Sequence, residues 1–136
     1  MTSYFYQLAA SIESVSGVIV WAEQAAQEHP DLPPASVNVL LVCLQELVAN
    51  VALHARCDDG KPTVKVGLDF AAERIGVLIE DNGHPFDPVN DAPCKVDTDL
   101  ASAGVGGRGV LIVRQLTRAM SYKRVGGWNC VRLDIA

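Results

Sequence analysis

The chain has 136 residues, of which 49% are hydrophobic, and its 11 basic and 16 acidic residues give a net charge of −5. This length allows one domain with a core of its own, and so high a hydrophobic fraction excludes an intrinsically disordered chain. The negative charge and the absence of a basic run argue against nucleic acid or an anionic membrane as partners. No basic leader precedes the first elements, and the longest apolar run, Val39–Leu44, is too short to span a bilayer, so we expect a cytoplasmic protein.

The first two predicted elements precede a proline-rich break. Residues Tyr4–Ala9 form a short aromatic and apolar segment that favours an edge strand. Residues Ile12–His29 repeat apolar side chains at a helical spacing, and Ser11 is suitably placed to cap that helix. Because the segment from His29 to Pro34 contains three prolines, we expect the helix to end there.

The longest uninterrupted helical pattern covers Ser36–Arg56, with Ser36 as the expected N-cap. Within it Glu46, Asn50 and His54 recur every four residues and form a narrow polar stripe on an otherwise apolar helix. Two interpretations are open. These polar groups are either satisfied locally in a partly buried helix, or they form the floor of a cavity. In such a cavity a carboxylate can polarise a hydroxyl and an amide oxygen can ligate Mg²⁺.

The remaining pattern predicts strands on both sides of an irregular segment. The predicted elements are two strands, a helix and two more strands, over Thr63–Phe70, Ile75–Ile79, Val110–Arg118, Ala119–Val125 and Asn129–Ile135. Residues 84–103 show no sustained period, which favours a functional lid, with a disordered insertion as the alternative. This order predicts a two-layer α/β (α+β) sandwich, with a mixed, largely antiparallel sheet and helices on one face, in one domain over residues 1–136.

Residues Gly104–Gly109 match the pattern G-x-G-x-x-G, which is a weak signal by itself. The dinucleotide interpretation requires a strand just before the motif and a parallel βαβ unit around it, and neither is predicted here. A Walker A loop is also excluded, because no Gly-Lys-Ser/Thr ends the motif. The backbone N–H groups of this loop, at a helix start and beside Arg108, nevertheless suit a phosphate group, with a plain flexible hinge as the alternative.

A third candidate feature is Asp81-Asn-Gly83, where an apolar strand ends. The Asp81 carboxylate can accept a hydrogen bond from an exocyclic amine, and Gly83 lets a flat base lie close to the backbone. By itself this tripeptide is a simple turn, since Asn-Gly is a common turn dipeptide. Together with Glu46, Asn50 and the glycine-rich loop, it indicates a mononucleotide site.

These motifs, in this order, resemble the GHKL (Bergerat-fold) superfamily of ATP-binding domains. The motifs are Glu46-x-x-x-Asn50 with His54-Ala55, Asp81-x-Gly83-x-Pro85-Phe86-Asp87 and Gly104-x-Gly-Gly-x-Gly109. In length and in motif order the chain is most similar to the small bacterial anti-sigma-factor serine/threonine kinases. The resemblance covers nearly the whole chain.

The resemblance implies ATP and Mg²⁺ as cofactors and a role for each motif. Glu46 would be the catalytic residue that orients or deprotonates the attacking hydroxyl, and Asn50 would ligate the Mg²⁺ that bridges the phosphates. Asp81 would bind the adenine amine, with Gly83 beneath the ring. Residues 84–103 would close as the ATP lid. The phosphates would be wrapped by the glycine-rich loop, that is by Gly104, Gly106, Gly107, Arg108 and Gly109.

The resemblance also implies protein partners. No separate helical domain of the kind that carries the phosphorylated histidine of histidine kinases is expected, which favours phosphoryl transfer to another protein. A serine on an anti-anti-sigma-like protein would be the acceptor, and a sigma-factor-like transcription regulator would be sequestered. A homodimer is a further expectation, with a contact through Tyr4–Tyr6 or through the first helix.

Two features depart from the family pattern. Many relatives have a threonine near the adenine, where this chain has Asn129 or Cys130, and residues 84–103 contain no basic cluster. The γ-phosphate contacts would therefore rest mainly on Arg108 and the backbone. Three functions are compatible with the sequence: an anti-sigma-type kinase, which we favour, a non-catalytic nucleotide-dependent switch module of the same fold, and a slow ATPase.

Overall fold

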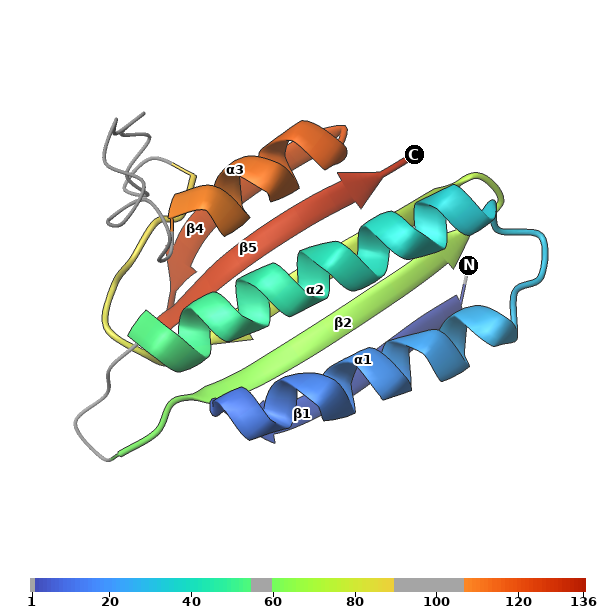
Figure 1. Cartoon of the computed structure of the whole chain (residues 1–136). Helices are drawn as coiled ribbons and strands as arrows, with labels where there is room; N and C mark the ends of the chain where they lie inside the picture. Colours follow the sequence, from blue (N-terminus) through green and yellow to red (C-terminus); the bar gives the residue numbers. More distant parts are fainter. Residues whose placement is uncertain (1, 55–59, 90–106) are drawn as a thin grey trace.

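The computed structural model describes residues 2–54, 60–89 and 107–136, and for residues 107 and 108 it describes the backbone alone (Figure 1). The described elements, in chain order, are β1 (Thr2–Ala9), α1 (Ile12–Gln27), α2 (Pro34–His54), β2 (Thr63–Ala71), β3 (Arg74–Asp81), α3 (Gly107–Leu116), β4 (Ala119–Val125) and β5 (Trp128–Ile135). The strands form one sheet in the order β1-β2-β3-β5-β4, and each neighbouring pair is antiparallel. The helices lie on one face of the sheet. The predicted two-layer sandwich is confirmed, with described strand pairs that are antiparallel throughout rather than mixed.

The starts of the first two helices differ in how well local sequence predicts them. Ser11 caps α1 as expected, because its Oγ accepts a hydrogen bond from the Ser14 backbone N–H at 3.2 Å. The prediction of Ser36 as the cap of α2 is wrong, since α2 begins at Pro34. Proline suits the first turn of a helix, where its missing N–H has no partner to lose. Ser36 is buried inside α2 instead, and its Oγ donates to the carbonyl of Ala136 at 2.5 Å.

α2 lies over the middle of the sheet, between α1 and α3 (Figure 1). Leu40, Leu44 and Val48 have no exposed surface, because their four-residue spacing places them on the face of α2 that packs onto the sheet. By length and hydropathy α2 would also qualify as a membrane-spanning helix. Its buried apolar residues, Leu40, Cys43, Leu44, Leu47 and Val48, account for part of that hydropathy.

β3 continues to Asp81, two residues beyond the predicted strand end at Ile79. Successive side chains of a strand point to opposite faces, and the buried residues of β3 are the alternate ones that end with Asp81. Asp81 therefore points into the helix layer although it is charged. Because β3 is a central strand, this carboxylate stands at the end of the core rather than in a surface turn.

The glycine-rich loop and the predicted lid are described only in part. α3 begins at Gly107, three residues before the predicted start at Val110, so Gly107 and Gly109 belong to its first turn. Gly104 and Gly106 lie outside the described residues, as does the side chain of Arg108. Of the predicted lid, residues 84–89 are described.

Candidate functional site

A cavity of about 190 Å³ lies between the C-terminal part of α2 and the end of β3. Its described lining residues are Asn50, Val51, His54, Asp81, His84, Pro85, Phe86 and Asn129. A smaller cavity of about 20 Å³ shares Asn50, Asp81 and Asn129 with it. Sites for drug-sized ligands usually enclose roughly 300–1,000 Å³, so the described cavity has the size for a base rather than for a whole nucleotide. The structure thus brings Asn50 and Asp81 to the wall of one cavity.

Asp81 is the buried acceptor of this cavity, with 7% of its surface exposed. Its Oδ1 accepts hydrogen bonds from the Gly83 backbone N–H and from Asn129 Nδ2, each at 3.0 Å. Burial raises the pKa of Asp81, while both hydrogen bonds and the positive charge of Arg124 act in the opposite direction. Arg124 also donates to the carbonyl of Gly83 at 2.8 Å, which fixes the turn after β3.

Asn129 is the polar partner of Asp81 on β5, and the sequence did not distinguish it from Cys130. The antiparallel register pairs Asp81 with Asn129 and Glu80 with Cys130. Asn129 therefore points into the helix layer, whereas Cys130 points to the other face, where its Sγ lies 3.4 Å from a Glu80 carboxylate oxygen. The strand pattern predicts this alternation, but the choice between the two residues depends on the register between β3 and β5.

Glu46 lies one turn before Asn50 on α2 and points to the start of α3. A Cβ built on Gly109 would lie 3.3 Å from Glu46 Cδ and 3.4 Å from Glu46 Cβ, and closer still to Glu46 Oε2. The carboxylate therefore fills the space that a side chain at position 109 would need. The first N–H groups of a helix lack partners within it and carry its positive dipole end, so Glu46 faces the part of α3 that attracts anions.

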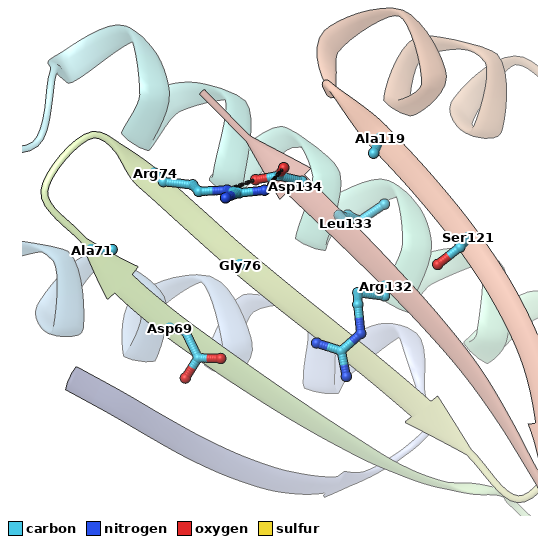
Figure 2. Close-up of a pocket in the computed structure, with 9 residues that line it drawn as sticks. All are labelled: Asp69, Ala71, Arg74, Gly76, Ala119, Ser121, Arg132, Leu133 and Asp134. Atoms are coloured by element: carbon cyan, nitrogen blue, oxygen red, sulfur yellow. Dashed lines mark hydrogen bonds and ion pairs between the residues drawn. The ribbon is translucent and has the colours of Figure 1, made fainter. Parts of the chain in front are cut away.

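A larger hollow lies away from this chemistry, on the face of the sheet opposite the helices (Figure 2). It has a volume of about 400 Å³ and a floor at Gly76, where no side chain projects. Arg74 and Asp134 form an ion pair along its edge, with Arg74 Nε 2.7 Å from Asp134 Oδ1. None of the residues singled out from the sequence lines this hollow. The cavity of about 190 Å³, with the buried Asp81 carboxylate and the Asn50 and Asn129 carboxamides at its wall, is therefore the better candidate site.

The sequence model of the histidine kinase-like ATPase domain family matches residues 8–135, so the chain belongs to that family. The fold and the matched family thus define a kinase-like ATPase domain of the GHKL type, which confirms the resemblance drawn from the motifs. Among curated proteins, serine/threonine-protein kinase BtrW of Bordetella bronchiseptica is similar to this chain, with 26% identity over 128 residues. That alignment covers 93% of this chain and 89% of the kinase.

Two solved structures share the fold. The first contains the RsbU and RsbW domains of Rv1364c from Mycobacterium tuberculosis, with a TM-score of 0.70 and 13% identity over 99% of this chain. The second is the histidine kinase domain of a blue-light activated histidine kinase from Erythrobacter litoralis, with a TM-score of 0.54 and 18% identity over 91% of this chain. The matched regions make up 32% and 59% of those longer chains, respectively.

Proposed function

We propose that the protein is an ATP-dependent serine/threonine protein kinase of the anti-sigma type, which phosphorylates a protein partner and sequesters a transcription regulator. The family match and the similarity to a serine/threonine kinase over most of its length support this proposal. The observation that carries it is the position of two residues on adjacent turns of α2. Glu46 meets the start of α3, and Asn50 borders the cavity that contains Asp81.

The residues around the cavity fit an adenine nucleotide. Asp81 offers a buried acceptor to an exocyclic amine, and the first turn of α3, whose backbone N–H groups have no partner inside the helix, suits phosphate oxygens. No cluster of three or more His, Cys, Asp or Glu residues that could hold a metal occurs in the described part of the chain. We assign the Asn50 amide, which borders the cavity, to Mg²⁺, an ion that usually keeps water and phosphate oxygens as its other ligands. Bound ATP with Mg²⁺ would supply the phosphoryl group and neutralise its charge.

The contribution of the chain is mainly to position groups. Asn50 on α2 and Asp81 on β3 line the same cavity, and the core fixes these two elements to each other. Glu46 accepts the hydroxyl hydrogen of an incoming serine and so orients the oxygen for attack. We assign the backbone of Gly104, Gly106, Gly107 and Gly109, with Arg108, to the phosphates, residues 84–103 to the lid, and residues 1–136 to one ATP-binding domain.

Glu46→Gln tests the catalytic assignment, because it keeps the size of the side chain and removes its charge. ATP affinity, measured by titration calorimetry, is expected to stay within about threefold, whereas phosphorylation of the partner falls by about 10²-fold or more. Glu73→Gln, in the exposed hairpin between β2 and β3, is the matched control and should transfer at the normal rate. A Glu46→Gln variant that transfers as fast as the wild type would refute the assigned role.

The partner itself is found by capture from cell extract with and without ATP and Mg²⁺, followed by intact-mass measurement of the captured protein after incubation. A gain of one phosphate on a serine supports the kinase. Captured but unmodified protein identifies a non-catalytic switch, and phosphate release without any partner identifies a slow ATPase. We place the reaction in the cytoplasm, with an anti-anti-sigma-like acceptor and a sigma-factor-like regulator as partners.

A homodimer belongs to the same proposal, although the structure changes which residues could form it. Tyr4 and Tyr6 are half-buried and pack on the core, with the Tyr6 ring 5.0 Å from that of Trp21. Phe5 lies between them on the opposite face and is 77% exposed. A contact through β1 would therefore use Phe5 rather than the tyrosines, and sedimentation of Phe5→Ser beside the wild type tests it.

A further inference from the structure

Asn129 is buried in the wall of the candidate site, with 3% of its surface exposed. Its Nδ2 group donates to Asp81 Oδ1 at 3.0 Å and to the His84 carbonyl at 2.9 Å. Its Oδ1 accepts from the Tyr122 hydroxyl at 2.6 Å and from the Phe86 backbone N–H at 3.2 Å. One carboxamide thus joins the end of β3, the segment after it and the edge strand β4.

These contacts use the full hydrogen-bonding capacity of the Asn129 side chain, which has two N–H donors and one oxygen with two lone pairs. They also fix its orientation, since a flipped amide would place its NH₂ group against the Phe86 backbone N–H and its oxygen against the Asp81 and His84 oxygens. Asn129 therefore has no polar group left for a nucleotide. Its effect on a bound base can act only through the residues that it holds.

The consequence falls on Asp81. Oδ1 of Asp81 is occupied by Gly83 and Asn129, whereas Oδ2 has no hydrogen-bond partner among the described residues. The described part of the chain contains no buried side-chain oxygen or nitrogen without a partner, so Oδ2 keeps some accessible surface, and Asp81 is a lining residue of the cavity. The carboxylate thus presents one oxygen, in one orientation, to whatever occupies the cavity.

We propose that Asn129 is a positioning residue that sets the selectivity of the site for 6-aminopurine (adenine) nucleotides over 6-oxopurine nucleotides, by holding Asp81 with a single acceptor oxygen directed at the base. This inference rests on the proposed function, in which Asp81 binds the base. The 6-amino group of adenine can donate a hydrogen bond to that oxygen. The 6-keto oxygen of guanine or hypoxanthine is an acceptor, so it would repel the carboxylate oxygen instead. Tyr122 supports the arrangement from β4, because its hydroxyl donates to Asn129 Oδ1 and holds the carboxamide in place.

Asn129→Asp is the sharpest test, because it exchanges one NH₂ group for an oxygen at unchanged size. The new carboxylate keeps both acceptor contacts, to Tyr122 and Phe86, but sets an oxygen against Asp81 Oδ1. Near neutral pH we expect ATP affinity to fall by about tenfold or more and GTP affinity to change little, so that the ratio between them collapses. Fluorescent ATP and GTP analogues, displaced by the unlabelled nucleotides, give both affinities.

The pH profile of that variant separates positioning from a merely structural role. As the pH falls, one proton shared by the two carboxyl groups restores a donor between them, so ATP affinity of Asn129→Asp should rise. In the wild type it should fall, because Asp81 loses its ionised form. His54 and His84 border the same cavity, so Asn129→Ala, which retains both histidines, provides the baseline.

Asn82→Asp is the matched control, since Asn82 is exposed and adjoins Asp81. Its Oδ1 accepts a hydrogen bond from the Thr63 backbone N–H at 2.7 Å, and an aspartate would keep this contact. It should leave the ATP-to-GTP ratio unchanged. If Asn129→Asp does not fold, as judged by circular dichroism, Tyr122→Phe should still lower the ratio by about threefold. If Asn129→Asp folds and its ratio of ATP to GTP affinity is unchanged, the inference is overturned. If it does not fold, an unchanged ratio in Tyr122→Phe overturns the inference. Either result leaves the proposed function intact. A wild type that binds neither nucleotide overturns the proposed function.

Discussion

Gly109 is the position at which a single methyl group should separate nucleotide binding from phosphoryl transfer. The Cβ of Gly109→Ala would overlap Glu46 Oε2 and would also lie 3.3 Å and 3.4 Å from Glu46 Cδ and Cβ. Rotation of the carboxylate about its own bond does not move Cδ, so the Glu46 side chain has to change its rotamer, whereas the 3.4 Å contact with Cβ is already at the edge of ordinary van der Waals distance. α2 and α3 need not move, because the group in the way is the end of a flexible side chain.

The expected magnitudes differ strongly between stability and catalysis. Alanine is preferred over glycine inside a helix by up to roughly 1 kcal/mol, and a displaced rotamer costs about 0.5–1.5 kcal/mol. These nearly cancel, so the free energy of unfolding should change by less than about 1 kcal/mol. A general base contributes on the order of 10²–10⁴-fold to rate, so transfer to the partner should fall at least about tenfold. ATP affinity should stay within about threefold, because the backbone N–H of residue 109 is retained.

The assay compares partner phosphorylation, ATP affinity and melting temperature for the wild type, Gly109→Ala, Glu46→Gln and the double variant. The double variant should lose no more than Glu46→Gln alone, because both changes act through one carboxylate. Gly76→Ala is the control, since the nearest atom to its added Cβ lies at an ordinary 3.6 Å on the far side of the sheet. Wild-type transfer by Gly109→Ala would refute the reasoning, as would a full additional loss in the double variant.

Three further changes have outcomes that follow from burial. Asp81→Asn should raise the melting temperature near neutral pH and weaken ATP binding. The pKa of this buried carboxyl is raised on folding, so ionisation destabilises the native state as the pH rises above the ordinary value of 3.8, and the gain should disappear below that value. Ser36→Ala should lower stability by about 1 kcal/mol, since it leaves the Ala136 carbonyl without its donor, and chemical denaturation measures this. Leu44→Ala, at a site without exposed surface, should cost about 2–5 kcal/mol in the same assay, and a smaller loss would contradict the packing of α2.

Much of the site is already implied by local patterns. Glu46 and Asn50 share a helix face because four residues make about one turn, and any helix over this segment places them together. Asp81 follows Ile75, Val77 and Ile79 at period two, which directs it into the core once the strand continues that far. The strand over Ala119–Val125 was predicted with the bounds that β4 has. These features depend on neighbours within a few residues, and the sequence contains those neighbours.

Other features depended on contacts between distant residues. The capping preference of Ser36 is a local signal, but its hydroxyl bonds to Ala136, 100 positions away, and α2 starts at Pro34. The choice of Asn129 over Cys130 needed the register of β5 against β3, since a shift of one residue would exchange their faces.

The amino-acid sequence by itself determined the family, the order of the elements and the residue types of the candidate site, because each depends on the spacing of residues within one motif, helix or strand. Only the tertiary structure decided that the Glu46 side chain fills the space that a side chain at position 109 would need, and that Asn129 donates a hydrogen bond to Asp81. Both contacts join elements that are far apart in the chain. Their geometry follows from how α3 packs on α2 and how β5 pairs with β3, and no local periodicity encodes either.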